Sequence, residues 1–456
     1  MHSFELGRAK SSTPTIDMCA IVPVLACVYA AIVAPLTAIA AQTPQSMLDS
    51  GLPNRIFWPA MAGISVVLAV RNYSRLRKLT FPPHIICLLA YLVFAGASVL
   101  WAFKPDFAFT RFVQQVMVVT SIVLPAMLAV RTADLMRGLF LWFALASILN
   151  VFFVLGNPTS IVTLQNGYPG YFPSKNQLGE FAALACLLAL HETHYPNLRR
   201  ALGIIVVVIA VSLLLLSNSK TAFGFALLAP LLARLTLIAR NKTRISIAAL
   251  LLSIPFCYVV ISSVTGFNMY RVSYLLYGDP TFTGRTTIWA FASSEIDLRP
   301  LLGWGYQSFW LAGSDAPSIL HAPGWIRNMP NAHSGYYDTM LEMGYVGLAL
   351  LVIFIVATLH AIGRVADRDP ARARLVLSLA LFIILYNFLE SFWMRGFETV
   401  WVVFVIIAAE IGRYWQPLPL ARAANASGSP RQASPVPLRG VLTHRPSNAR
   451  HSKAES

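Results

Sequence analysis

The sequence has little charge and no paired cysteines. Only 12% of its 456 residues are Asp, Glu, Lys or Arg, whereas 57% are hydrophobic and the mean hydropathy is +0.63. A water-soluble chain of this length needs more charge on its surface, so a soluble protein is excluded. None of the five cysteines forms a CxxC pair, and all lie in hydrophobic runs. They are interpreted as packing residues and indicate no disulfide framework.

Motifs that would indicate a bound cofactor are missing as well. The sequence has no glycine-rich nucleotide-binding loop and no nicotinamide-binding fingerprint. Its His and Cys residues do not have the spacing of metal ligands, and the acidic residues Asp279, Glu295, Asp297 and Asp315 form no close motif. We therefore expect neither a cofactor nor a metal.

Hydrophobic runs dominate the sequence instead. Twelve of them are long enough to cross a bilayer as helices. Their predicted boundaries are 18–41, 53–70, 83–103, 110–130, 136–156, 176–191, 201–216, 221–239, 245–264, 337–360, 372–389 and 394–414. The sequence thus predicts an all-α, polytopic integral membrane protein with about 12 transmembrane helices and one long loop.

Basic residues alternate between the two sides of this predicted bundle. One set of loops holds 18 Lys and Arg residues, whereas the short loops and helix ends opposite hold six: Arg55, Lys104, Arg111, Lys175, Lys220 and Arg395. By the positive-inside rule the richer set faces the cytoplasm. Both termini are then cytoplasmic and the long loop is periplasmic, as expected for a bacterial inner-membrane protein. Topology accounts for the net charge of +16, and nucleic acid is not an expected partner.

These assignments divide the chain into five segments. They are a cytoplasmic N-terminus (1–17), helices one to nine (18–264), a periplasmic catalytic loop (265–336), helices ten to twelve (337–414) and a disordered basic cytoplasmic tail (415–456). The first hydrophobic run ends in AIAA, which resembles a signal-peptidase site. Because that run exceeds the roughly 7–15 residues of a signal-peptide core, we expect it to be retained.

Polar residues gather at helix ends on the predicted periplasmic side. Arg111 begins the fourth helix, Lys175 lies in PSKNQLGE, and Lys220 lies in SNSKT. Ionisable residues at such positions indicate function by default. The alternative for each is a side chain that reaches the lipid headgroups or caps its helix.

The long loop contains a short amphipathic segment. Between residues 286 and 298 the apolar side chains fall mostly on one helical face, which predicts a short interfacial helix at the membrane surface. Gly284 permits a turn just before it and leaves Arg285 near the helix start, directed toward the bundle. PLLGWGY at 300–306 then predicts a tight turn with its aromatic residues at the interface. An ordinary interfacial anchor is the alternative for this stretch.

His333 lies in NAHSGYYDTMLEMGYVGL, just outside the tenth predicted helix. The dipole at a helix N-terminus disfavours an imidazolium, which keeps the ring neutral and able to accept a proton from a hydroxyl group. His333 is therefore a candidate general base. The alternative is a satisfied interfacial histidine, since His321 lies in the same loop. Gly344 and Gly347 on this helix would permit close packing.

The run GR…W…PLLGWGYQSF followed by NAHSGYYDTMLEMGYVGL resembles the O-antigen ligase and polysaccharide polymerase family. The resemblance implies a polytopic glycosyltransferase that moves glycans from undecaprenyl diphosphate carriers to a periplasmic acceptor. It also implies that His333 is the essential loop histidine, that Arg285 is the loop arginine, and that Lys220 occupies a basic position. Many ligases have arginine there. Lysine looks closer to the exopolysaccharide polymerase branch, and it offers a point charge where arginine offers a fork.

The resulting hypothesis is a metal-independent, inverting glycosyltransferase that polymerises undecaprenyl-diphosphate-linked repeats for exopolysaccharide or O-antigen. Fixed cations would stabilise the departing diphosphate: Lys220, Arg285, Arg111 and Lys175. The implied partners are the lipid-linked donor, a glycan acceptor, the bilayer and other polysaccharide export and chain-length proteins. Two alternatives remain, a ligase acting on the lipid A core and a lipid-linked glycan flippase. A transporter, however, should place ionisable residues near the midplane and show related halves.

Overall fold

The computed structural model of the chain describes residues 17–41, 51–130, 133–156, 166–267 and 284–416, together with residues 271, 274, 278 and 282. All regular structure in these residues is helical, which confirms the predicted fold class. The N-terminal segment before Asp17 lies outside the described residues, and so does the predicted tail after Gln416.

Each of the twelve predicted spans corresponds to helical structure. The helices are α1 (Met18–Val28), a π-helical turn (Tyr29–Val33), α2 (Ala34–Ala41), α4 (Leu52–Arg71), α5 (Tyr73–Leu76), α6 (Pro83–Ala97), a 3-10 turn (Ser98–Trp101), α7 (Pro105–Leu128), α8 (Leu135–Gly156), α9 (Lys175–Glu192), α10 (Leu198–Leu216), α11 (Lys220–Thr243), α12 (Ile247–Thr265), α14 (Arg285–Leu298), α15 (Pro317–Leu320), a 3-10 turn (Gly324–Asn328), α16 (Gly335–Arg368), α17 (Pro370–Tyr386) and α18 (Thr399–Arg413).

Nine helical segments in the described part of the chain are long and apolar enough to cross a membrane. The three predicted spans that do not reach this standard are α9, α17 and α18. With 15 residues, α18 is about 22 Å long, shorter than the roughly 30 Å hydrocarbon core. A polytopic membrane protein is confirmed, and the count of twelve spans is not.

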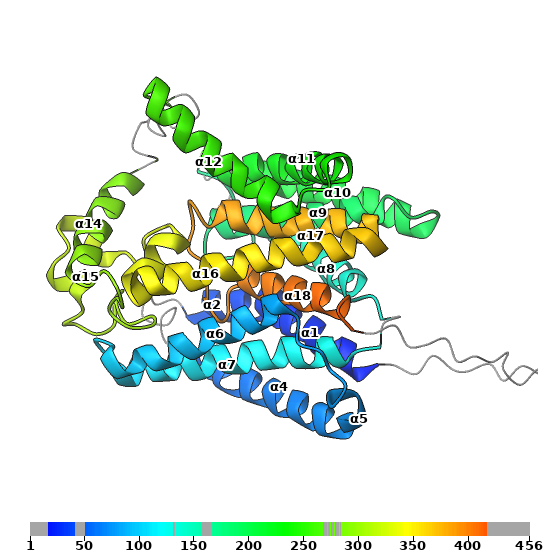
Figure 1. The fold of residues 1–456 in the computed structure, drawn as a ribbon, viewed down its shortest axis with the longest axis horizontal. Coiled ribbons are helices and arrows are strands. Elements are labelled where there is room, and N and C mark those ends of the chain that lie inside the picture. Colours follow the sequence, from blue (N-terminus) through cyan, green and yellow to red (C-terminus); the bar gives the residue numbers. More distant parts are fainter. Residues whose placement is uncertain are drawn as a thin grey trace, which may run out of the picture. The chain divides into compact units, whose positions relative to one another are not determined.

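The short helices are the most enclosed ones. Every residue of α18 is buried, and an unbroken buried run extends along α9 from Leu178 to Ala189. By contrast, only 17% of the apolar window of α12 and 22% of that of α4 are buried. In Figure 1, α17 and α18 lie inside the bundle, with α12 and α4 on opposite outer faces, while α14 and α15 gather at one end. The long outer helices therefore present their apolar side chains to lipid, and the short inner helices form the core.

Three local predictions are corrected by the structure. The last helix begins at Thr399 rather than at 394, because residues 387–398 fold inward as a loop. The predicted helix in the long loop exists as α14, but its apolar face packs against this chain's own aromatic residues. Trp304 and Tyr306 are buried at 7% and 0% exposure, so they do not serve as interface anchors.

Candidate active site

The candidate site is centred on Glu390, in the loop between α17 and α18. Its carboxylate accepts a hydrogen bond from Arg285 Nη2 at 2.7 Å and from Asn176 Nδ2 at 3.0 Å, both at Oε1. Its second oxygen lies 3.2 Å from His333 Nδ1. The side chain of Glu390 is only 10% exposed, whereas that of His333 is 31% exposed. One buried carboxylate thus joins the two residues that sequence analysis assigned to catalysis.

Three helix N-termini meet around this carboxylate. Arg285 is the first residue of α14, Asn176 is the second of α9, and His333 lies two residues before the start of α16. The backbone N–H of Gly335 also donates to the Glu390 carbonyl at 2.9 Å. Because helix N-termini carry partial positive charge, their convergence favours an anion at this place.

Local sequence explains why the Glu390 loop approaches α16 so closely. Asn387 caps the C-terminus of α17, and its Oδ1 accepts hydrogen bonds from the backbone N–H groups of Phe392 and Trp393, which folds the loop back on itself. A Cβ on Gly335 would lie 2.4 Å from that same Oδ1. Only glycine at 335 leaves room for this turn, so Asn387 and Gly335 together bring Glu390 to His333.

The start of α16 is held in place by a break in the helix. Gly344 has φ +63°, a conformation that favours glycine, and the helical hydrogen bonds are interrupted there. The loop segment before α16 supplies the missing partners: Trp304 N donates to Leu341 O, and Tyr345 N donates to Pro300 O, both at 2.8 Å. The PLLGWGY motif therefore fills the break and fixes the first turns of α16 relative to α14. Gly344 does permit close packing, although against this loop segment rather than another helix.

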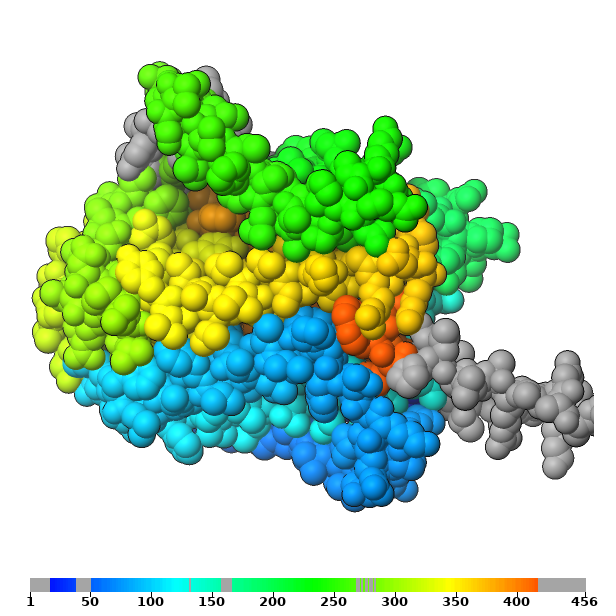
Figure 2. Space-filling view, viewed as in Figure 1, coloured from blue at the N-terminus to red at the C-terminus, as the bar shows by residue number. Residues whose placement is uncertain are grey.

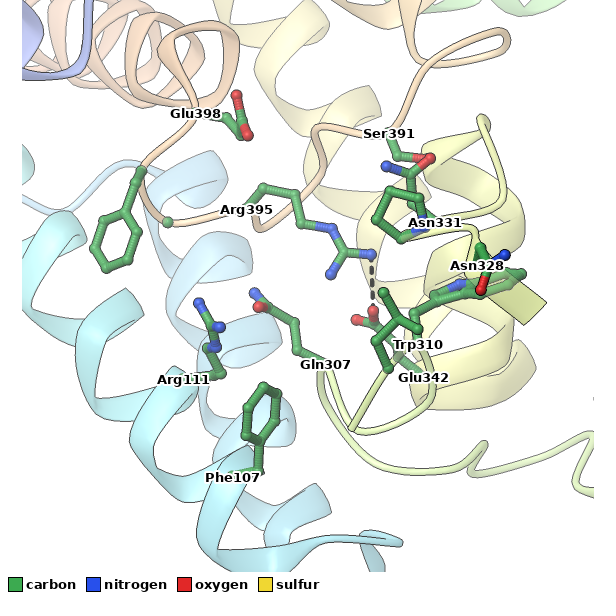
Figure 3. A pocket seen from close by; sticks show the side chains of 14 residues that line it. Phe107, Arg111, Gln307, Trp310, Asn328, Asn331, Glu342, Ser391, Arg395 and Glu398 are labelled. Carbon is green, nitrogen blue, oxygen red and sulfur yellow. Dashed lines mark ion pairs between the residues drawn. The ribbon is translucent and has the colours of Figure 1, made fainter. Parts of the chain in front are cut away.

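A second charged cluster is centred on Arg395, which lies in the same loop between α17 and α18 as Glu390. Arg395 Nη2 lies 2.8 Å from Glu342 Oε1 and 3.1 Å from Asp338 Oδ2. Trp310 Nε1 donates to Asp338 Oδ1 at 2.8 Å. This cluster borders a cavity of about 270 Å³ that is also lined by aromatic and amide side chains, among them Phe107, Phe397, Gln307, Asn328 and Asn331. Figure 3 shows Arg395 directed at Glu342, with Arg111 and Gln307 beside it.

The predicted site residues are therefore distributed over several places. Arg285 and His333 are brought together through Glu390. Arg111 instead lines the cavity beside Arg395, with its guanidinium 4.9 Å from the Phe107 ring centre. Lys175 is half-buried next to Asn176, at the start of α9. Lys220 is exposed at the start of α11, and neither lysine is ion-paired with another residue that the structure describes.

Sequence reasoning missed three members of the site. Asn176 lay inside the noted polar run PSKNQLGE, and Arg395 was counted only as a topology marker. Glu390 was not singled out at all. A signal existed for it, since a carboxylate directly after a predicted membrane helix, on the side that carries the other polar clusters, is costly unless it is paired.

The structure leaves this region open on one side. Figure 2 shows a hollow between α12 and α16, close to α14, with orange atoms of the α17 to α18 region at its floor.

Among the residues that the structure describes, no three His, Cys, Asp or Glu side chains are grouped so that they could hold a metal ion.

Comparison with known proteins shows what this chain is similar to. Residues 205–352 match the family described as O-Antigen ligase. The chain is 28% identical over 305 residues to the exopolysaccharide production protein ExoQ of Rhizobium meliloti (strain 1021), a match that covers 62% of this chain and 67% of that protein. It is 24% identical over 173 residues to putative polysaccharide ligases of Rickettsia prowazekii and Rickettsia typhi, covering 34% of this chain and 42% of theirs. This multi-pass membrane protein is thus similar to O-antigen ligases over residues 205–352 and to proteins of polysaccharide production and ligation, which supports a polysaccharide-related membrane function.

Proposed function

We propose that the chain is a glycosyltransferase that joins oligosaccharide repeats carried on undecaprenyl diphosphate, and that it does so at the Glu390 site. The observation that carries this proposal is the contact of one buried carboxylate with both Arg285 and His333. The group that activates the hydroxyl and the group that binds the diphosphate must both contact one substrate. Because Glu390 contacts both His333 and Arg285, it keeps these two groups close together.

Glu390 also determines which nitrogen of His333 is available. An ionised carboxylate can only accept hydrogen bonds, so the proton of a neutral His333 resides on Nδ1, which faces Glu390 Oε2. Nε2 then carries the lone pair. In the proposed step the acceptor hydroxyl oxygen bonds to the anomeric carbon, its proton passes to Nε2, and the bond from that carbon to the diphosphate oxygen breaks. Glu390 stabilises the imidazolium that forms.

Arg285 provides the charge for the leaving group. Its guanidinium has five N–H donors, and one of them, on Nη2, is bonded to Glu390 Oε1. In the proposed complex further donors of this group bind diphosphate oxygens. Lys175 adds a second cation. It is the first residue of α9, directly before Asn176. Because the hydroxyl attacks from the side opposite the departing diphosphate, a single displacement inverts the anomeric centre. No step in this scheme requires a metal.

The cavity beside Arg395 suits the glycan acceptor. Sugars present apolar C–H faces and hydroxyl edges, which match the aromatic rings of Phe107 and Phe397 and the amides of Gln307 and Asn331. Asn331 also accepts the backbone N–H of His333 at 2.9 Å, so the cavity and the base are neighbours. A glycan seated there would place a hydroxyl toward His333.

Polymerisation is favoured over ligation to the lipid A core. The relative that matches the larger share of the chain is named an exopolysaccharide production protein. By the family resemblance, Lys220 stands at a position where many ligases have arginine. The test is to give the purified protein a lipid-linked repeat alone. Polymer formation supports a polymerase. Product only when lipid A core is added supports a ligase, and movement of lipid across a vesicle without product supports a flippase.

The proposed orientation has its own test. We expect residues 284–336 to face the periplasm of a bacterial inner membrane, since the loops at the opposite end carry most Lys and Arg. Cys257 is exposed and is first replaced by Ser. A cysteine at the exposed Ser314 should then react with an impermeant maleimide added to intact spheroplasts, whereas one at the exposed Ser74 should not. The reverse pattern would contradict the orientation.

A further inference from the structure

Two cavities adjoin each other at the end of α16 farthest from His333. Each has a volume of about 520 Å³, and three residues line both of them: Ser246, His360 and Trp415. We call the pair the α12–α16 groove, because the start of α12 and the second half of α16 form most of its walls. The proposed glycosyl transfer uses none of these residues.

One half of the groove is apolar. The wall from α16 contains Val352, Ile353, Val356, Ala357 and Ala361, and it faces Ala248, Ala249 and Leu252 of α12. Several of these side chains are open to the surroundings, with Val352 41% exposed, Ile353 52% and Leu252 46%. In α12 only Ile247, Ala248 and Leu251 are buried, so most of that helix is not enclosed by the bundle. This half therefore opens toward the bilayer and suits a hydrocarbon chain.

The other half is basic. Its lining includes three arginines, Arg240, Arg244 and Arg364, and a single acidic residue, Asp367. Arg240 Nη2 is paired with Asp367 Oδ1 at 2.7 Å, so the pair contributes no net charge. Arg244 and Arg364 are exposed, and the Arg364 guanidinium lies over the Trp415 ring at 4.0 Å. The basic half thus has a net charge of +2, carried by two accessible guanidinium groups.

We propose that the α12–α16 groove binds an anionic phospholipid, with phosphate between Arg244 and Arg364 and an acyl chain along Val352, Ile353 and Leu252. Two guanidinium groups best match a lipid with two phosphates. The ammonium group of a zwitterionic lipid would meet the same positive charge and be repelled. A free phosphate would gain nothing from the apolar half, so the continuity of the two cavities argues for a lipid.

The experiment uses the full chain in neutral detergent and measures lipid binding by native mass spectrometry. Cardiolipin, phosphatidylethanolamine and inorganic phosphate are titrated separately. The double variant Arg244→Glu/Arg364→Glu removes the phosphate site, and Ala249→Trp fills the apolar half without changing charge. The matched control is Arg77→Glu/Lys78→Glu, which makes the same charge change at exposed residues after α4.

We expect the wild type to bind cardiolipin at least about tenfold more tightly than phosphatidylethanolamine, from roughly 1 kcal/mol per nearby cation. Both groove variants should lose this preference, and the control should keep it. Equal binding of both lipids, competition by inorganic phosphate, or equal loss in the control would overturn the proposal. Retained binding by Ala249→Trp would also overturn it. Should the double glutamate variant elute as an aggregate, Arg244→Gln/Arg364→Gln replaces it.

Discussion

Two ends of the bundle each contain a buried charge cluster, and they differ in how their charges are used. The far cluster joins the starts of α8, α10 and α17 to the ends of α9 and α18; its members are Asp134, Glu192, Arg199, Arg372, Glu410 and Arg413. It contains three cations and three anions, and each is paired within the cluster. The site cluster instead leaves the side chain of His333 31% exposed.

The comparison separates structural charges from functional ones. In the far cluster Arg372 lies 2.7 Å from Asp134, and Arg413 lies 2.6 Å from Glu410 while also donating to the carbonyls of Val130 and Ala133. These contacts hold helix ends together, and the nitrogens that they leave without a hydrogen-bond partner, Arg372 Nε and Nη1 and Arg413 Nε, are buried. Although burial alone would raise the pKa of Asp134, Arg372 and Arg199 outweigh it and lower that pKa. The stability contributed by Asp134 is thus present at neutral pH and is lost as the pH falls through the lowered pKa.

The largest effect on catalysis is expected at the site cluster. His333→Ala should lower the rate of transfer by about 10² to 10⁴, the usual contribution of a general base, and leave donor binding largely intact. Steady-state kinetics with a purified lipid-linked donor measure both quantities. Glu390→Gln keeps the shape but loses the charge that fixes the His333 proton, so it should lower kcat as well. A wild-type rate in His333→Ala would contradict the mechanism.

A comparable free-energy change at the far cluster should affect stability alone. Arg372→Met removes the cation closest to Asp134, which keeps only Arg199 at 3.9 Å, while Glu410 stays paired with Arg413. Breaking a buried ion pair in this way typically costs about 3–5 kcal/mol of unfolding free energy. Thermal unfolding in detergent should therefore shift down strongly, while kcat per folded molecule stays unchanged. Lys104→Met, which breaks the exposed pair with Asp315, is the matched control and should change stability by under about 1 kcal/mol. A loss of kcat without destabilisation would show that Arg372 acts in catalysis rather than in stability.

Arg285 tests whether the shape of a cation matters at the site. Arg285→Lys keeps the charge but cannot contact Glu390 and a diphosphate at once, so it loses charge-assisted hydrogen bonds worth about 1.5–3 kcal/mol. We expect kcat/KM for the donor to fall by about 10- to 100-fold, with both KM and kcat affected. Full activity would mean that charge alone is sufficient.

The smallest effect is expected at Lys220. Because this lysine is exposed and is not ion-paired with a described residue, Lys220→Ala should reduce kcat/KM for the donor by less than about fivefold, and Lys220→Arg should restore it. A loss as large as that of Arg285→Lys would show that Lys220 reaches the diphosphate when the donor is bound.

The sequence by itself determined the membrane class, the helical fold and the approximate positions of the long helices, and it singled out His333 and Arg285 as residues of interest, Arg285 through a family resemblance. These follow from local properties, since a hydrophobic run must become a helix in lipid and a polar residue at its end is conspicuous. The tertiary structure decided which cations share a site. Arg111 and Lys175 look alike in sequence, yet the first lines the Arg395 cavity and the second lies beside Asn176.

Only the tertiary structure could identify Glu390 and the break at Gly344. Glu390 becomes a site residue because Asn387 folds its loop against Gly335, and α16 breaks because residues 300–305 supply the missing hydrogen bonds. Both depend on contacts between segments more than 35 residues apart, which no local pattern encodes. The short lengths of the buried helices α9, α17 and α18 were also decided by tertiary structure. A core helix packs against its neighbours and does not have to be long enough to span the bilayer by itself.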